Sequence, residues 1–395
     1  MSNNKSYVES IGLINMLLCI LYLIDPFNYG YIFSNILIIS VLLKIEQFKS
    51  NIDNNFFILL LFSISYAIFY SFNLSLGSQF IFIYALYPSC FYIIGKIFYQ
   101  KLPESYRIFD LLLYTGLLFS TSAMISVLVS IYTKGFVVLE RDVPMIWGGD
   151  KIPATNMAAY FVLNMSIPAF LVANFKRFGF LSKILLTLIF MLSVICVLRL
   201  GSRTQLSISF ITFLASLVYL LRRQSLKQNV ILFGILFLLF NVFISYVSLS
   251  KDSDIMSAFA GRMESKKYGA ATAGGRTERW SKSIINLWEK PLGWQVDDFG
   301  FSHNLWFDVA RVGGTLTFLL LLYFCIKNAM KIKTSIFINK ENILLNTQFI
   351  CYGLSFYLLF FVEPIFDGYY PVFILYCFFI GIIAQHINHN NTINS

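Results

Sequence analysis

Blocks of about 20 mostly apolar residues recur along the whole chain, separated by short polar gaps. A helix that crosses a bilayer needs roughly that length of apolar sequence. The chain of 395 residues is 57% hydrophobic and only 13% charged, which does not fit a soluble globular protein. We therefore predict an all-α fold, a polytopic membrane helix bundle of about 12 transmembrane helices.

The first apolar block, residues 11 to 24, lacks a basic preceding region and a small-residue cleavage site, so we interpret it as a retained helix rather than a signal peptide. The predicted spans are residues 9 to 27, 30 to 46, 56 to 72, 78 to 98, 108 to 133, 155 to 175, 180 to 199, 203 to 221, 229 to 249, 305 to 326, 345 to 363 and 369 to 386.

Lysine and arginine are enriched in every second connection, which predicts that the N-terminus is cytoplasmic. The inside connections carry Lys44, Lys49, Lys96, Lys101, Arg107, Lys176, Arg177, Lys183, Arg222, Arg223, Lys227, Lys327, Lys331, Lys333 and Lys340. Both termini then lie inside, and residues 134 to 154, 199 to 203 and 250 to 304 lie outside. The net charge of +10 thus fixes orientation and needs no nucleic acid partner.

The order of spans and loops divides the chain into four sections. Residues 1–133 are N-terminal spans, residues 134–249 are central spans with an outer loop and a Ser-Arg motif, residues 250–304 are the long outer loop, and residues 305–395 are C-terminal spans and a tail. The six cysteines all fall in apolar blocks without metal-ligand spacing, so we expect neither a disulfide framework nor a metal site.

The five tryptophans all fall on the predicted outer side, as Trp147, Trp280, Trp288, Trp294 and Trp306. They could form an interfacial belt, pack internally, or stack on sugar rings. Trp280, Ile284, Leu287 and Trp288 recur at helical spacing within the long loop, which predicts an amphipathic helix lying on the membrane or capping the spans. We expect Pro291 and Gly293 to end it.

Arginines on the outer side run against the orientation rule, and at span ends they have a desolvation cost. A guanidinium donates two parallel hydrogen bonds to phosphate oxygens and keeps its charge, so several around one cavity would bind a diphosphate. Alternatively, each snorkels to lipid head groups or pairs with an acid such as Asp142, Glu264 or Glu278. The candidates are Arg141, Arg199, Arg203, Arg262, Arg276, Arg279 and Arg311. Arg203 in Gly-Ser-Arg-Thr and Arg276 in Gly-Gly-Arg-Thr are the favoured functional residues.

His303 is the only histidine outside the C-terminal tail, and it lies in Ser-His-Asn-Leu-Trp where the long outer loop re-enters the membrane. A lone histidine is more often structural than catalytic. Its position beside an arginine-rich loop nevertheless favours catalysis, because an imidazole can take a proton from an attacking hydroxyl and nearby arginine charge would keep it neutral.

The C-terminal half, roughly residues 140 to 385, resembles the O-antigen polymerase and O-antigen ligase family of bacterial membrane glycosyltransferases. The resemblance rests on five ordered pieces: Leu-Gly-Ser-Arg-Thr-Gln at 200 to 205, Gly-Gly-Arg-Thr-Glu-Arg-Trp at 274 to 280, Glu-Lys-Pro-Leu-Gly at 289 to 293, His-Asn-Leu at 303 to 305 followed by Gly313 and Gly314, and Glu-Pro-Ile-Phe-Asp at 363 to 367. The two glycines stand adjacent here, where the family usually spaces them over a helical turn.

The resemblance implies that a hydroxyl of an acceptor glycan attacks the anomeric carbon of a sugar held on undecaprenyl diphosphate, and that the lipid diphosphate leaves. It implies no cofactor and no metal. His303 would be the general base, and Arg203 and Arg276 would stabilise the diphosphate. Arg141, Arg279 and Arg311 would bind diphosphate or glycan, and Asn304 would orient His303 or the acceptor.

The implied partners are the lipid-linked oligosaccharide donor and acceptor, membrane lipids and a separate chain-length regulator. The implied location is the bacterial inner membrane with a periplasmic active site. Polymerase and ligase share this chemistry and differ in the acceptor, which is a lipid-linked repeat unit or the lipid A core; we expect a polymerase. A lipid-linked oligosaccharide flippase would also have about twelve spans. Flippases usually carry internal repeats and short outer loops, and a purely structural scaffold would not explain the arginines around His303.

Overall fold

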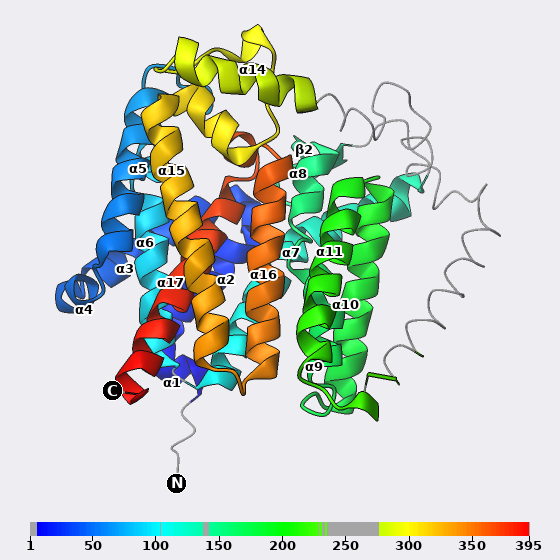
Figure 1. Ribbon diagram of the computed structural model, residues 1–395. Coiled ribbons are helices and arrows are strands. Elements are labelled where there is room, and N and C mark those ends of the chain that lie inside the picture. Colours follow the sequence, from blue (N-terminus) through cyan, green and yellow to red (C-terminus); the bar gives the residue numbers. More distant parts are fainter. Residues whose placement is uncertain are drawn as a thin grey trace. The chain divides into compact units, whose positions relative to one another are not determined.

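The computed structural model describes residues 6–102, 104–136, 142–227, 229–230, 234 and 276–394. Across these ranges the chain is almost entirely helical (Figure 1). Within them the only sheet is a pair of two-residue strands, β1 (Val143–Pro144) and β2 (Lys151–Ile152), which run antiparallel. The prediction of an all-α chain is therefore confirmed.

Seven of the described helices are long and apolar enough to cross a membrane, so the chain is a multi-pass membrane protein. They are α6 (Gln79–Lys101), α7 (Ser105–Lys134), α10 (Phe180–Arg199), α11 (Arg203–Leu221), α15 (Leu305–Ile338), α16 (Ile343–Val362) and α17 (Tyr370–Asn394). Three shorter apolar helices fall on further predicted spans: α2 (Leu13–Ile24), α3 (Gly30–Leu42) and α5 (Asn54–Tyr70). The span predicted at 229 to 249 lies almost wholly outside the described residues, so the total of twelve stays a prediction.

The predicted span at 155 to 175 is not one continuous helix. It is divided into α8 (Ala154–Ala159), the 3-10 turn η2 (Asn164–Ser166) and α9 (Ile167–Ala173). The buried amide of Asn164 donates to the Ser120 hydroxyl at 2.6 Å within this interruption. Buried polar groups need such partners, and Pro168 at the start of α9 lacks the backbone N–H that would continue the helical ladder.

Helix α15 runs to Ile338, twelve residues beyond the predicted end of its span at 326. Lys327, Lys331 and Lys333 therefore lie on the helix and not in a loop. The sequence analysis places these lysines in an inside connection, but lysine side chains on a helix that continues past the bilayer indicate the same orientation.

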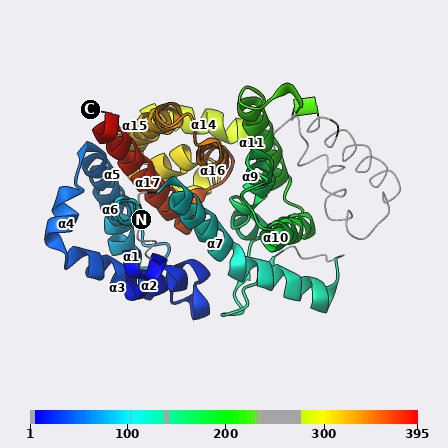
Figure 2. The ribbon, with the colours of Figure 1, turned by 90° about the horizontal axis from the view of Figure 1, so that it is seen from below.

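The described chain forms two compact units. Unit 1 comprises Met1–Phe119, Gly275–Lys340 and Phe356–Ser395, and unit 2 comprises Ser120–Gly274 and Glu341–Ser355. Each unit combines segments from several of the predicted sequence sections. In unit 1, α6 packs along α17, and α5 lies against both α6 and α15 (Figures 1 and 2). Gly95 and Gly381 stand where the backbones of α6 and α17 meet, with no room for a side chain.

Unit 2 is built on the C-terminal half of α7, the strand pair and α8 to α11, with a core that includes Phe161, Val197 and Leu200. Arg199 is 1% exposed and ends α10. Its Nε donates to the Gly135 carbonyl at 3.2 Å, just past the end of α7. Arg199, a candidate for phosphate binding, thus has a structural role.

The long loop predicted before α15 contains α14 (Arg276–Glu289), which confirms the helix expected there. Figure 1 shows α14 lying across the end of unit 1 from which α15 starts. Ile284, Ile285 and Trp288 are exposed on it. The remaining short elements are α1 (Tyr7–Ile11), η1 (Pro26–Asn28), α4 (Ile45–Ser50), η5 (Val296–Asp298) and η6 (Ile365–Asp367).

Candidate active site

A break in α15 positions the loop that carries His303. Gly314 has φ 70° and ψ −178°, a conformation open essentially to glycine alone, and it interrupts the helix after its first nine residues. The loop after α14 fills the space beside the break. The Pro291 carbonyl accepts from the Thr315 N–H at 2.9 Å, and the Arg311 carbonyl accepts from the Trp294 N–H at 2.9 Å. Gly314 therefore divides α15 into a short first segment, residues 305 to 313, and the remainder.

The His303 backbone is held by a buried carboxylate in that first segment. Asp308 is 0% exposed and accepts from the N–H of Ser302 at 2.8 Å and of Asn304 at 3.1 Å, on either side of His303. His303 itself has φ 52°, which is unusual for a residue other than glycine. Asn304 caps α15, because its Oδ1 accepts from two backbone N–H groups of the first turn. This capping role differs from the orienting role predicted for Asn304.

Three residues of α14 hold the other side of the same loop. Arg279 Nη1 donates to the Phe301 carbonyl at 2.9 Å, and Trp280 Nε1 donates to the Ser302 carbonyl at 2.9 Å. The hydroxyls of Ser283 and Ser302 lie 2.7 Å apart. The Trp280 indole is thus engaged in packing and a backbone hydrogen bond, which favours the packing role among those considered for the tryptophans.

Arg276 and His303 converge on one buried carboxylate, that of Glu363. Glu363 follows the last residue of α16 and is 0% exposed. Arg276 Nη2 lies 3.6 Å from Glu363 Oε1, and His303 Nδ1 lies 4.0 Å from Glu363 Oε2. The Tyr369 hydroxyl donates to Oε2 at 3.4 Å. Residues separated by 27 and 60 positions in the sequence therefore form one polar cluster within unit 1.

The electrostatics of the cluster keep His303 neutral. Burial, followed by the positive charges of Arg276 and Arg279, lowers the pKa of His303 from 6.5 to about 4. Its Nδ1 is buried and makes no hydrogen bond to the described residues, while the side chain as a whole is 32% exposed. Since Nδ1 is closed off, Nε2 is the ring nitrogen left to accept a proton from a substrate.

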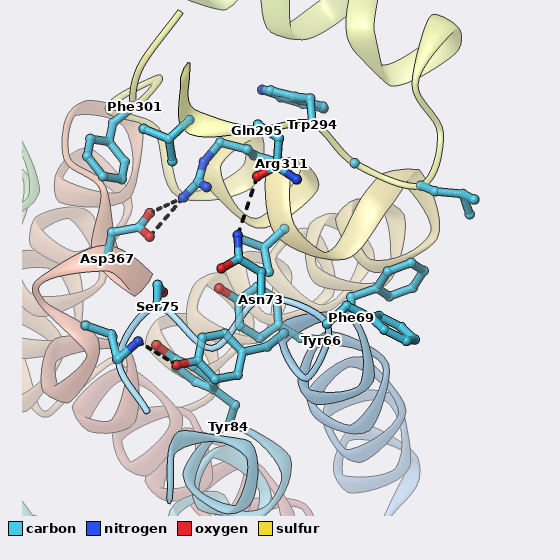
Figure 3. A pocket seen from close by; sticks show the side chains of 17 residues that line it. Tyr66, Phe69, Asn73, Ser75, Tyr84, Trp294, Gln295, Phe301, Arg311 and Asp367 are labelled. Atoms are coloured by element: carbon cyan, nitrogen blue, oxygen red, sulfur yellow. Dashed lines mark hydrogen bonds and ion pairs between the residues drawn. The ribbon is translucent and has the colours of Figure 1, made fainter. Parts of the chain in front are cut away.

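Arg311 is part of a second polar group. Its Nη2 lies 2.9 Å from both oxygens of Asp367, and its guanidinium lies 5.2 Å from the centre of the Phe301 ring (Figure 3). Burial raises the pKa of Asp367, and the charge of Arg311 opposes that effect. Because Arg311 is 7% exposed and its charge is balanced by Asp367, it is poorly suited to the diphosphate binding predicted for it.

The structure thus brings Arg276, Arg279 and His303 to one place, while Asn304 and Arg311 serve neighbouring contacts. Arg203 is the first residue of α11, in unit 2. Arg141 and Arg262, also candidates, lie outside the described residues.

Three acids that hold the site together were not predicted as site residues: Glu363, Asp367 and Asp308. From the sequence, the turn at 363 to 367 is identified only as one of the pieces of the resemblance. An acid at or inside the end of a span is costly to bury, as an arginine is, so the positions of these three acids in the sequence are a signal by which they could have been found.

The sequence matches no protein-family model and no curated protein.

Proposed function

We propose that the protein is an O-antigen polymerase, which joins undecaprenyl-diphosphate-linked oligosaccharide repeat units by glycosyl transfer and releases the lipid diphosphate. The proposal places it in the bacterial inner membrane, with the site on the periplasmic side and both termini in the cytoplasm. The observation that carries it is the convergence of Arg276 and His303 on Glu363. The sequence motifs that resemble the O-antigen polymerase and ligase family include all three of these residues.

The charge of this cluster supports an anionic substrate. Arg276 and Arg279 bring two guanidinium groups to the cluster against the single carboxyl group of Glu363, while the lowered pKa leaves His303 uncharged at neutral pH. The cluster is then positive overall, and guanidinium groups suit the oxygens of a diphosphate leaving group. Fixed cations aimed at a leaving group act strongly where water is excluded.

In the proposed step, the acceptor hydroxyl oxygen forms a bond to the anomeric carbon of the donor sugar. The bond from that carbon to the diphosphate oxygen breaks, and its electron pair leaves with the lipid diphosphate. The hydroxyl proton passes to Nε2 of His303, whose Nδ1 faces Glu363. Arg276 stabilises the negative charge that develops on the leaving group, and Arg203 is assigned the same role by the resemblance.

The test replaces His303 with asparagine. Asparagine tolerates a positive φ, so His303→Asn keeps the backbone conformation at φ 52° and removes the base. We expect turnover of purified lipid-linked repeat units to fall by about 10²- to 10⁴-fold, as for loss of a general base. His303→Ala should leave a folded, membrane-inserted and inactive protein.

The matched control is His389→Asn, in the C-terminal part of α17, which should keep full activity. Products are resolved as a ladder of glycan lengths on a gel. A wild-type protein that builds no ladder from lipid-linked repeats, and instead transfers glycan only to lipid A core, would be a ligase. Full activity of His303→Asn would remove His303 from the mechanism.

A further inference from the structure

A cavity of about 340 Å³ lies in unit 1 beneath the loop between α14 and α15. Small-molecule sites span roughly 300–1,000 Å³, so the cavity fits a compact ligand. His303, Arg276 and Glu363 do not line it. Figure 3 shows its walls, which come from α5, the loop between α5 and α6, the first turns of α6, loop residues 292 to 301, α15 and the turn η6.

Aromatic side chains form much of the wall. Tyr66 and Tyr84 are each 2% exposed, and Phe69, Trp294 and Phe301 also line the cavity. Aromatic rings offer flat apolar faces, and those of tyrosine and tryptophan carry a polar edge as well. Such faces pack well against the C–H faces of a sugar ring, which is equally flat and has polar groups around its edge.

Polar groups stand among these rings. Arg311 uses Nη2 for Asp367, and its Nε is buried without a hydrogen-bond partner in the described chain. The Nε1 of Trp294 is likewise buried without a partner among the described residues. At the rim, Asn73 Nδ2 donates to Gln295 Oε1 at 3.4 Å (Figure 3). The cavity therefore offers hydrogen-bond donors, a carboxylate acceptor and two amides, each of which can donate and accept hydrogen bonds.

The charge of the cavity distinguishes between ligand classes. Arg311 and Asp367 are the only charged residues among those that line it, and their charges cancel. A phosphate would need an excess of positive charge, which the Arg276 cluster has and this cavity lacks. A hydrocarbon chain would leave the polar groups without partners, which is costly when they are buried. A neutral ligand rich in hydroxyl groups satisfies both conditions.

From these features we propose that the cavity binds a saccharide unit of the acceptor glycan. Its role as the acceptor's site rests on the proposed function, whereas saccharide binding rests on the cavity alone. The two sites share their supports: Phe301 of the cavity is two residues before His303, and Asp367 is four residues after Glu363. A glycan held in the cavity is thereby anchored beside the residues assigned to catalysis.

The test measures saccharide binding directly. Lipid-linked repeat units are extracted from cells of the source organism that lack this protein, and mild acid releases the oligosaccharide that serves as the probe. The protein is held in phospholipid nanodiscs, because alkyl glycoside detergents carry sugar head groups that would compete. Saturation-transfer NMR gives the Kd for the wild type, for an Asn73→Ala/Gln295→Ala double variant, and for a control.

Asn73 and Gln295 are both exposed, so their removal leaves no buried group unpaired and the variant should fold. We expect its Kd to rise about tenfold or more, as for the loss of one or two hydrogen bonds to ligand hydroxyls. Asn391→Ala, which removes an exposed amide far along α17, should bind as the wild type does. Wild-type protein that binds no oligosaccharide, or a double variant that binds it equally well, would overturn the proposal. So would an acyl chain found in the cavity.

Ladder formation from the intact lipid-linked repeats is measured in parallel. A protein that binds the free oligosaccharide through Asn73 and Gln295 and builds no ladder would retain the saccharide site and lose the polymerase assignment. A protein that builds a ladder and shows no effect of the double variant on binding would keep the assignment and lose the site.

Discussion

Replacing Glu363 with glutamine removes one negative charge from the centre of the cluster and keeps its size and shape. Glu363 is 0% exposed, and its carboxylate lies 3.6 Å from Arg276 Nη2 and 4.0 Å from His303 Nδ1. The glutamine can still accept from the Tyr369 hydroxyl, which lies 3.4 Å away. The substitution therefore tests the charge of Glu363 and leaves its packing in place.

The cost in stability follows from the exposure of the partner. Breaking a fully buried ion pair costs about 3–5 kcal/mol, because the remaining charge is stranded. The Arg276 side chain is 22% exposed and can turn toward water, so we expect about 1–2 kcal/mol for Glu363→Gln. The cost in turnover should be larger. Arg276 and His303 both lose the group that positions them, and misplacement of reacting groups by about 1 Å can cost about 10²-fold.

The assay compares kcat and KM for lipid-linked repeats with the midpoint of thermal unfolding. A positioning role predicts that kcat falls about 10²-fold, that KM changes little, and that the protein stays folded. Glu341→Gln, in the turn between α15 and α16, removes an exposed carboxylate and is the matched control. If Glu363→Gln kept the kcat of the wild type while His303→Asn abolished it, Glu363 would have no part in positioning His303.

Two further perturbations test the electrostatics of the site and the break in α15. Burial and the charges of Arg276 and Arg279 lower the pKa of His303 to about 4, so kcat/KM should persist below pH 6.5 and fall only near pH 4. Arg279→Gln removes one of these charges and should move the fall to higher pH. If the fall does not move, His303 is not the group that titrates. Gly314→Ala should destabilise the protein by about 3 kcal/mol, because the added Cβ would collide with the preceding loop and the residue has a positive φ. The control is Gly179→Ala, at φ −62° and with nothing within 4 Å of the added Cβ, which should change the stability by no more than about 0.5 kcal/mol. Equal melting temperatures for the two variants would refute the strain argument.

The helical class and most span positions could be predicted because membrane burial imposes a long apolar run that is visible residue by residue. The amphipathic helix α14 was equally accessible, since Trp280, Ile284 and Trp288 recur at helical spacing. The breaks within the predicted spans could not be predicted. An apolar run gives no sign that Asn164 will find Ser120 or that Gly314 will adopt a positive φ, because both depend on neighbours far away in the sequence.

The site could be predicted as far as single residues carry an intrinsic anomaly. His303 and Arg276 stood out as a lone histidine and an outside arginine. Glu363 did not, because a single acid in a short turn also satisfies the topology rule, and only packing shows that it faces both of them. The sequence alone also does not distinguish Arg276, which lies beside Glu363, from Arg311, which pairs with Asp367.

The short first segment of α15 explains how one piece of chain can support two sites. Asn304, Asp308 and Arg311 follow one another at spacings of four and three residues, so they lie along one face of the helix. Asn304 caps the segment, Asp308 holds the backbone on both sides of His303, and Arg311 holds Asp367. Gly314 ends the segment, so the segment does not continue the helical geometry of the membrane-spanning remainder of α15. A continuous helix would have no break to receive residues 291 to 294, where the Pro291 carbonyl accepts from the Thr315 N–H and the Trp294 N–H donates to the Arg311 carbonyl, so the loop that connects the two sites would lose its anchor.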